Sequence, residues 1–69
     1  MDRVPVVSST VSSVGYDVGT QTLEVEFSNG NVYQFFDVPE AVHQQLMQAA
    51  SAGAFFNGNI KGSYRYARM

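Results

Sequence analysis

Residues 61–68 combine cationic and aromatic side chains at a spacing that suits nucleic-acid binding. The set is Lys61, Tyr64, Arg65, Tyr66 and Arg68. Arginine pairs with phosphate oxygens through its planar guanidinium, and tyrosine stacks on an unpaired base. These five residues are therefore the candidate RNA-binding site. In the competing interpretation, which the small number of cations favours, the tyrosines pack at the edge of a core and the cations keep the surface hydrated.

Charge is unevenly distributed along the 69 residues, although the net charge is only −2. Residues 1–52 hold all six acidic residues and one base, whereas residues 53–69 hold three bases and no acid. The four Lys and Arg residues of the chain are too few for strong non-specific binding to nucleic acid. Any RNA contact should therefore be weak and local to the basic segment.

Catalytic and metal-binding chemistry finds little support in the residue types. His43 is the only histidine and the chain has no cysteine, so a metal site would depend on carboxylates alone for further ligands. A serine nucleophile would have only His43 as its base, and no G-x-S-x-G motif is present. Glu24 and Glu26 lie about 7 Å apart on one strand face, where two carboxylates are ordinarily solvated. The sequence predicts no enzyme activity, catalytic residue, metal or cofactor.

A β-hairpin over residues 22–36 is the strongest structural signal. Apolar and acidic side chains alternate strictly from Leu23 to Phe27, which is the period of a strand with one buried face. Aromatic and branched side chains dominate residues 32–36 and suit a second strand. Asn29-Gly30 between them is typical of a hairpin turn.

The length of the hairpin loop decides which side chains share a face. A two-residue loop would bury Gln34 with the apolar residues of the first strand. A three-residue loop, Ser28–Gly30, pairs Val25 with Tyr33 and collects the apolar side chains on one face. Burial should select this second register, which requires a left-handed backbone at Gly30.

The remaining segments complete an α+β fold. We expect a three-stranded antiparallel β-meander, with one main helix and a short C-terminal helix packed on one face. The expected elements are strands Val11–Tyr16, Thr22–Phe27 and Asn31–Phe36, and helices Pro39–Ala52 and Phe55–Ile60. The predicted core is Leu23, Val25, Phe27, Tyr33, Phe35, Val42, Leu46 and Phe56.

Residues that typically begin, end or interrupt helices and strands refine this assignment. Asp37 and Glu40 have the spacing of a capping box, and Gly53 is the expected helix stop. Gly15 indicates a bulge or a close backbone approach within the first strand. Residues 3–10 should form an extended lead-in that pairs only at a sheet edge because of Pro5, and residues 63–69 are a candidate extended tail along the sheet.

Length and composition set the remaining bounds. The chain predicts a single domain over residues 1–69. No apolar run approaches the roughly 18 residues that a membrane span needs, and no signal peptide is visible. With the absence of cysteine, this composition is compatible with a cytoplasmic protein. The sequence does not fix the oligomeric state.

Several short blocks, in one order over nearly the whole chain, resemble the KTSC domain. The blocks are Gly15-Tyr16-Asp17, Leu23-Glu24-Val25-Glu26-Phe27, Asn29-Gly30, residues 32–39, Phe55-Phe56-Asn57, residues 59–62 and Tyr64-Arg65-Tyr66. This family is named after the C-terminal extension of some lysyl-tRNA synthetases and also occurs as small stand-alone bacterial proteins. Its central Tyr-x-Tyr appears here as Tyr33-Gln34-Phe35, without the second hydroxyl.

The resemblance implies a domain of unknown function for which RNA binding has been suggested. We therefore expect a small non-enzymatic binding module whose partner is RNA, bound weakly. The alternative is a protein–protein or homo-oligomerising module that uses the acidic sheet face, an exposed strand edge and Phe36.

Overall fold

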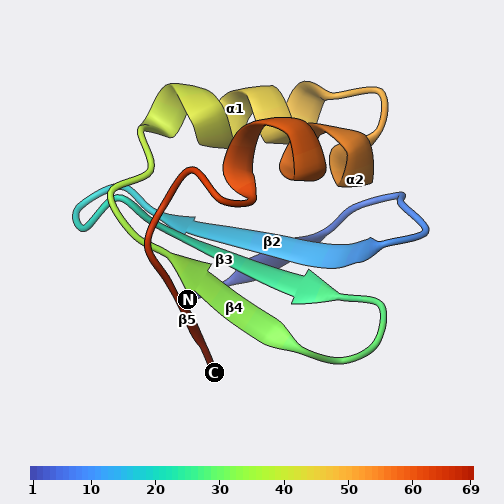
Figure 1. Cartoon of the computed structure of the whole chain (residues 1–69), viewed down its shortest axis with the longest axis horizontal. Helices are drawn as coiled ribbons and strands as arrows, with labels where there is room; N and C mark the ends of the chain where they lie inside the picture. Colours follow the sequence, from blue (N-terminus) through green and yellow to red (C-terminus); the bar gives the residue numbers. More distant parts are fainter.

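An antiparallel sheet forms one layer of the computed structural model, which describes residues 1–69, and helices cover one face of that sheet (Figure 1). The strands follow one another in the order β1-β2-β3-β4-β5, so each pairs with its neighbour in the sequence. The elements are β1 (Arg3–Pro5), β2 (Val11–Asp17), β3 (Thr22–Phe27), β4 (Val32–Phe35), α1 (Glu40–Gln48), α2 (Ala52–Phe55), the π-helix η1 (Phe56–Ile60) and β5 (Tyr66–Arg68).

The prediction of three strands was wrong, because the sheet has five. The three central strands lie where they were expected, within one residue at each end. The lead-in and the tail supply the additional edge strands β1 and β5, each only three residues long. Strands this short carry no readable periodicity, and their hydrogen bonds to β2 and β4 define them.

The hairpin has the register of the three-residue loop. Leu23 pairs with Phe35, and Val25 pairs with Tyr33. The main-chain N–H of Phe27 donates to the carbonyl of Asn31 at 2.8 Å, and Gly30 has a φ of 92°. That left-handed conformation favours glycine, so the prediction for Gly30 is confirmed.

Gly15 lies where another part of the backbone approaches β2. A Cβ at this position would stand 2.7 Å from the main-chain oxygen of Asp2. The close approach predicted for Gly15 is therefore present, whereas the irregularity in the β2–β3 ladder lies between Val11 and Ser13.

The predicted main helix, Pro39–Ala52, is shorter in the structure, and the predicted short helix, Phe55–Ile60, is present as α2 and η1 but begins three residues earlier, at Ala52. Helix α1 ends at Gln48, because Ala49 adopts an extended conformation, and α2 begins at Ala52. The hydroxyl of Ser51 accepts a hydrogen bond from the N–H of Ala54 at 3.1 Å. Ser51 thus caps a new helix where the sequence pattern predicted the continuation of the first.

Two further helix signals differ from expectation. Pro39 is the N-cap of α1 and no side chain caps this end, so the capping box of Asp37 and Glu40 does not form. Gly53 lies inside α2, where a Cβ would come within 3.2 Å of the Thr10 side chain. A glycine is therefore favoured at this position because α2 packs closely against the segment before β2, and not because a helix ends there.

The core lies between the sheet and the helices. Five of the predicted core residues are buried, whereas Phe27, Tyr33 and Val42 are only half-buried. The cluster of ten buried apolar residues is Val11, Val14, Leu23, Val25, Phe35, Val38, Leu46, Ala52, Phe56 and Ile60. Phe27 and Tyr33 are only half-buried because both side chains line an open groove.

Candidate functional site

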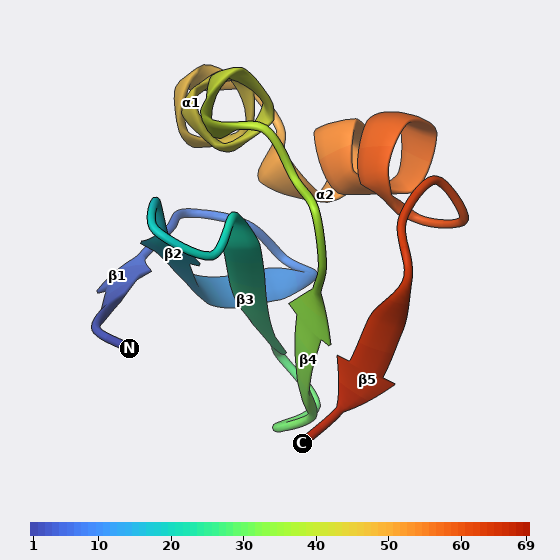
Figure 2. The ribbon, with the colours of Figure 1, turned by 90° about the vertical axis from the view of Figure 1, so that its left-hand side faces the viewer.

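An open groove of about 480 Å³ lies where strands β3, β4 and β5 meet η1. Figure 2 shows the helical segment after α1 standing above β4 and β5. We call this hollow the aromatic groove, because five aromatic side chains line it: Phe27, Tyr33, Phe35, Phe56 and Tyr66. Thr10, Asn57, Lys61 and Gly62 complete the lining.

The aromatic rings form a connected array. Phe56 packs edge-to-face against Phe27 and Phe35, with ring centroids 5.1 and 5.3 Å apart. Tyr66 lies tilted against Tyr33 and Phe35, at 5.8 and 5.9 Å. Phe35 and Phe56 are buried, whereas Tyr66 is 61% exposed. The groove therefore has a fixed apolar floor and one ring that is largely open to solvent.

The π-helix η1 forms the polar wall of the groove. The N–H of Lys61 donates to the carbonyl of Phe56 at 2.9 Å, which is the i→i+5 bond of a π-turn. Phe56, Asn57 and Lys61 all line the groove from this turn. The side chains of Asn57 and Lys61 are exposed and have no hydrogen-bond or ion-pair partner in the chain.

Three of the five predicted site residues lie on the groove side. Lys61 and Tyr66 line the groove. Arg68 follows Tyr66 by two residues on β5 and so shares its face, and its guanidinium donates to the Asn31 side chain at 3.1 Å. Tyr64 is half-buried and packs against the core.

Arg65 lies outside this group. Its guanidinium pairs with the Asp37 carboxylate at 2.9 Å and stands 5.6 Å from the centre of the Phe36 ring. Arg65 and Asp37 are both exposed, at 77% and 74% of their side-chain surface. Because side chains alternate along a strand, Arg65 and Tyr66 belong to opposite faces.

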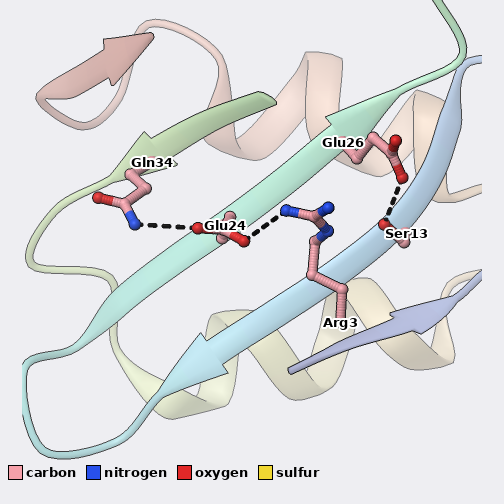
Figure 3. A network of polar contacts seen from close by, with 5 residues as sticks. All are labelled: Arg3, Ser13, Glu24, Glu26 and Gln34. Carbon is pink, nitrogen blue, oxygen red and sulfur yellow. Dashed lines mark hydrogen bonds and ion pairs between the residues drawn. The ribbon is translucent and has the colours of Figure 1, made fainter. Parts of the chain in front are cut away.

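The face of the sheet away from the helices carries a network of polar contacts (Figure 3). Glu24 accepts hydrogen bonds from Arg3 at 2.6 Å and from Gln34 at 2.9 Å. Glu26 accepts from the Ser13 hydroxyl at 2.8 Å. Glu24 is only 6% exposed, so the expectation of two solvated carboxylates was wrong for this residue. Arg3 on the edge strand β1 reaches across β2 to it, which local sequence could not indicate.

The electrostatics of this network stabilise the ionised form of Glu24. The hydrogen bond from Gln34, followed by the hydrogen bond and charge of Arg3, lowers the pKa of Glu24 despite its burial. A general acid would need the opposite shift. The network thus has the properties of a structural element that ties β1, β3 and β4 together.

His43 lies apart from both the groove and the network. Its ring stacks on Tyr16, with centroids 4.7 Å apart and planes 7° from parallel. Burial lowers the pKa of His43, while the hydroxyl of Tyr16 donates to the carbonyl of Val38.

No group of three or more His, Cys, Asp or Glu residues has an arrangement that could hold a metal ion. None of the helices has the length and hydrophobicity needed to cross a bilayer.

Together, the five-stranded antiparallel sheet, its single helical layer and the groove between them define a small two-layer α+β domain. The sequence matches the KTSC domain over residues 7–64, and the chain belongs to this family. The resemblance noted from the sequence blocks is therefore confirmed.

Relatives include both stand-alone proteins and a segment of a larger one. An uncharacterized protein of Stutzerimonas stutzeri (strain A1501) is 47% identical over 70 residues, covering 100% of this chain and 99% of the relative. A lysine–tRNA ligase of Nostoc punctiforme is 39% identical over 61 residues, which are 88% of this chain but 11% of the ligase. The crystal structure of a KTSC domain protein from Yersinia pestis is 43% identical, with a TM-score of 0.94 over 99% of this chain and 96% of that one.

Proposed function

We propose that this domain is a binding module that takes a short unpaired stretch of RNA in the aromatic groove. The observation that carries the proposal is the largely exposed Tyr66 ring, which lies against a buried aromatic ring in a groove that Lys61 also lines. Stacking on aromatic side chains is the usual way in which proteins hold unpaired bases. The relationship to a segment of a lysine–tRNA ligase supports the same partner class.

The positions of the cations limit the electrostatic part of this binding. Lys61 and Arg68 are on the groove side, whereas Arg65 is paired with Asp37. Two phosphate contacts on a single strand give a slope of log affinity against log salt near −1.4, so a fourfold rise in salt should weaken binding about sevenfold. Affinity should therefore depend more on stacking than on charge.

Fluorescence anisotropy with a labelled single-stranded RNA hexamer, rU6, tests the proposal. Stacking on an aromatic side chain contributes about 1–3 kcal/mol per base, so Tyr66→Ala should weaken binding about 5- to 150-fold. Arg68→Ala and Arg65→Ala form a matched pair, since both remove one arginine from the same segment. Only Arg68→Ala should lower the affinity and flatten the salt slope, by about 0.7.

Two results would refute the proposal. The first is the absence of an anisotropy change at high-micromolar protein and low salt. The second is an equal loss of affinity in Arg65→Ala and Arg68→Ala, because binding would then follow net charge and not the groove. Thermal melts of each variant establish that the folded protein is being compared.

The free edge of the sheet favours a second candidate function, a contact with another protein. Strand β5 pairs only with β4, and all three of its residues are exposed. An extended segment of a partner or of a second copy can add to such an edge through main-chain hydrogen bonds. Sedimentation velocity over a range of protein concentrations measures self-association, and an unchanged sedimentation coefficient would exclude the second copy.

A further inference from the structure

The polar wall of the aromatic groove contains a side chain that no contact within the chain explains. Asn57 lines the groove, is exposed and has no hydrogen-bond partner in the chain. Asn59, two residues later, instead donates to the carbonyl of Phe55 at 3.2 Å and does not line the groove. The two asparagines of η1 thus differ in their surroundings, because only Asn57 lines the groove and has its whole amide group unused by contacts within the chain.

Three groups that a nucleotide can use line the same groove, namely an aromatic ring, an amide and an ammonium group. Tyr66 offers a ring face from β5, and Lys61 offers an ammonium group from the residue that follows η1. Asn57 lies about one turn before Lys61 on the polar wall. If a base stacks on Tyr66 and its phosphate contacts Lys61, the sugar that joins them lies in the groove that Asn57 also lines.

We infer that Asn57 hydrogen-bonds the ribose 2′-hydroxyl of a nucleotide bound in the aromatic groove, so that the site selects ribose over deoxyribose. A 2′-hydroxyl both donates and accepts hydrogen bonds, and the amide of Asn57 can accept through its oxygen or donate through its nitrogen. Base identity contributes little to this contact, since every base has a face that can stack on Tyr66. The inference rests on the proposed function and assigns the substrate class of the same site.

Paired ribo- and deoxyribo-oligonucleotides of identical sequence test the inference by anisotropy. The probes are rU6 and dU6, which differ only in the 2′-hydroxyl. One hydrogen bond changes an equilibrium constant about two- to tenfold, so the wild type should prefer rU6 by that factor. In Asn57→Ala the affinity for rU6 should fall to that for dU6, while dU6 affinity stays unchanged. Asn59→Ala is the matched control and should keep the ribose preference.

The outcomes separate the inference from the function on which it rests. Equal affinity of the wild type for rU6 and dU6 would overturn the ribose contact while leaving a groove that binds single strands. A ribose preference that survives in Asn57→Ala would also overturn it, because another group would then read the sugar. Binding of neither hexamer would overturn the proposed function itself, as would binding of 5′-UMP as tightly as rU6, which would assign the site to a free ribonucleotide.

Discussion

Replacing Arg3 with alanine should destabilise the fold through the carboxylate of Glu24. The ion pair joins two residues 21 positions apart at 2.6 Å, and Glu24 is 6% exposed. Without Arg3, the charge of Glu24 stays buried with Gln34 as its remaining side-chain partner. Removing one member of a fully buried pair costs about 3–5 kcal/mol. The Arg3 side chain is 33% exposed, so water can enter its place and we expect a loss of about 1.5–3 kcal/mol.

This loss is large for a chain of this size. A stability of roughly 0.05–0.15 kcal/mol per residue gives about 3–10 kcal/mol for 69 residues. A loss of about 2 kcal/mol should lower the melting temperature by about 8–16 °C in a domain of this length. Urea unfolding, followed by circular dichroism, measures the free energy directly.

A double-mutant cycle separates the ion pair from other contacts of Arg3. In a Glu24→Gln background the anion is absent, so Arg3→Ala should cost less there than in the wild type. The difference should be about 1–2 kcal/mol, within the range found for residues in direct contact. Equal costs in the two backgrounds would refute the account, since Arg3 would then stabilise β1 without the charge of Glu24.

Acidification gives a second measurement of the same contact. The pKa of Glu24 is lowered in the folded state, first by the hydrogen bond from Gln34 and then by Arg3. Its contribution is therefore present above the unfolded pKa of about 4.3 and is lost as the pH falls through the lower folded pKa. The wild type should lose more stability between pH 7 and about pH 3 than Glu24→Gln does.

Other experiments test the close approach of backbones, the aromatic packing and the half-buried histidine. Gly15→Ala should lower stability by about 1–3 kcal/mol in thermal melts, because the new Cβ would meet a main-chain oxygen at 2.7 Å. Gly58→Ala, with no heavy atom within 4 Å, should be neutral or stabilise by up to about 1 kcal/mol. Phe56→Ala should cost about 3–5 kcal/mol in urea unfolding, and Phe27→Ala less, because Phe27 is half-buried. A proton NMR titration should place the pKa of His43 below its ordinary value, because burial disfavours the charged ring.

The parts of the fold that the sequence predicted are those with repeated local signals. Alternation over residues 23–27 and the Asn29-Gly30 turn together predicted the hairpin, and burial of its apolar side chains on one face predicted the register. The edge strands β1 and β5 have three residues each and no such repetition, so pairing with an existing strand edge is what defines them. Helix α1 ends before the predicted boundary at Ala52, and Ser51 caps α2, because periodicity alone does not reveal a side-chain cap.

The candidate site was predicted by residue type but not by arrangement. Lys61 and Tyr66 were named because of their chemistry, and the pairing of Tyr66 with Phe35 places that tyrosine at the groove. The same pairing sends Arg65 to the other face, where it meets Asp37. The position of Asn57 in the groove could not be predicted from the sequence, because a polar residue on a short helix is ordinary. Its place in the lining depends on the π-turn of η1.

The two faces of the β3–β4 hairpin depend on one register. Glu24 lies directly opposite Gln34 in the ladder and accepts its hydrogen bond, while Tyr33 and Phe35 point to the groove side from the positions on either side of Gln34. A slip by one residue would turn Gln34 into the groove and both rings out of it, because side chains alternate with a period of two. The same slip would leave the Glu24 carboxylate without its amide partner. We therefore interpret the buried polar contact as a device that specifies the register, so that the aromatic groove on one face is maintained by the hydrogen bond on the other.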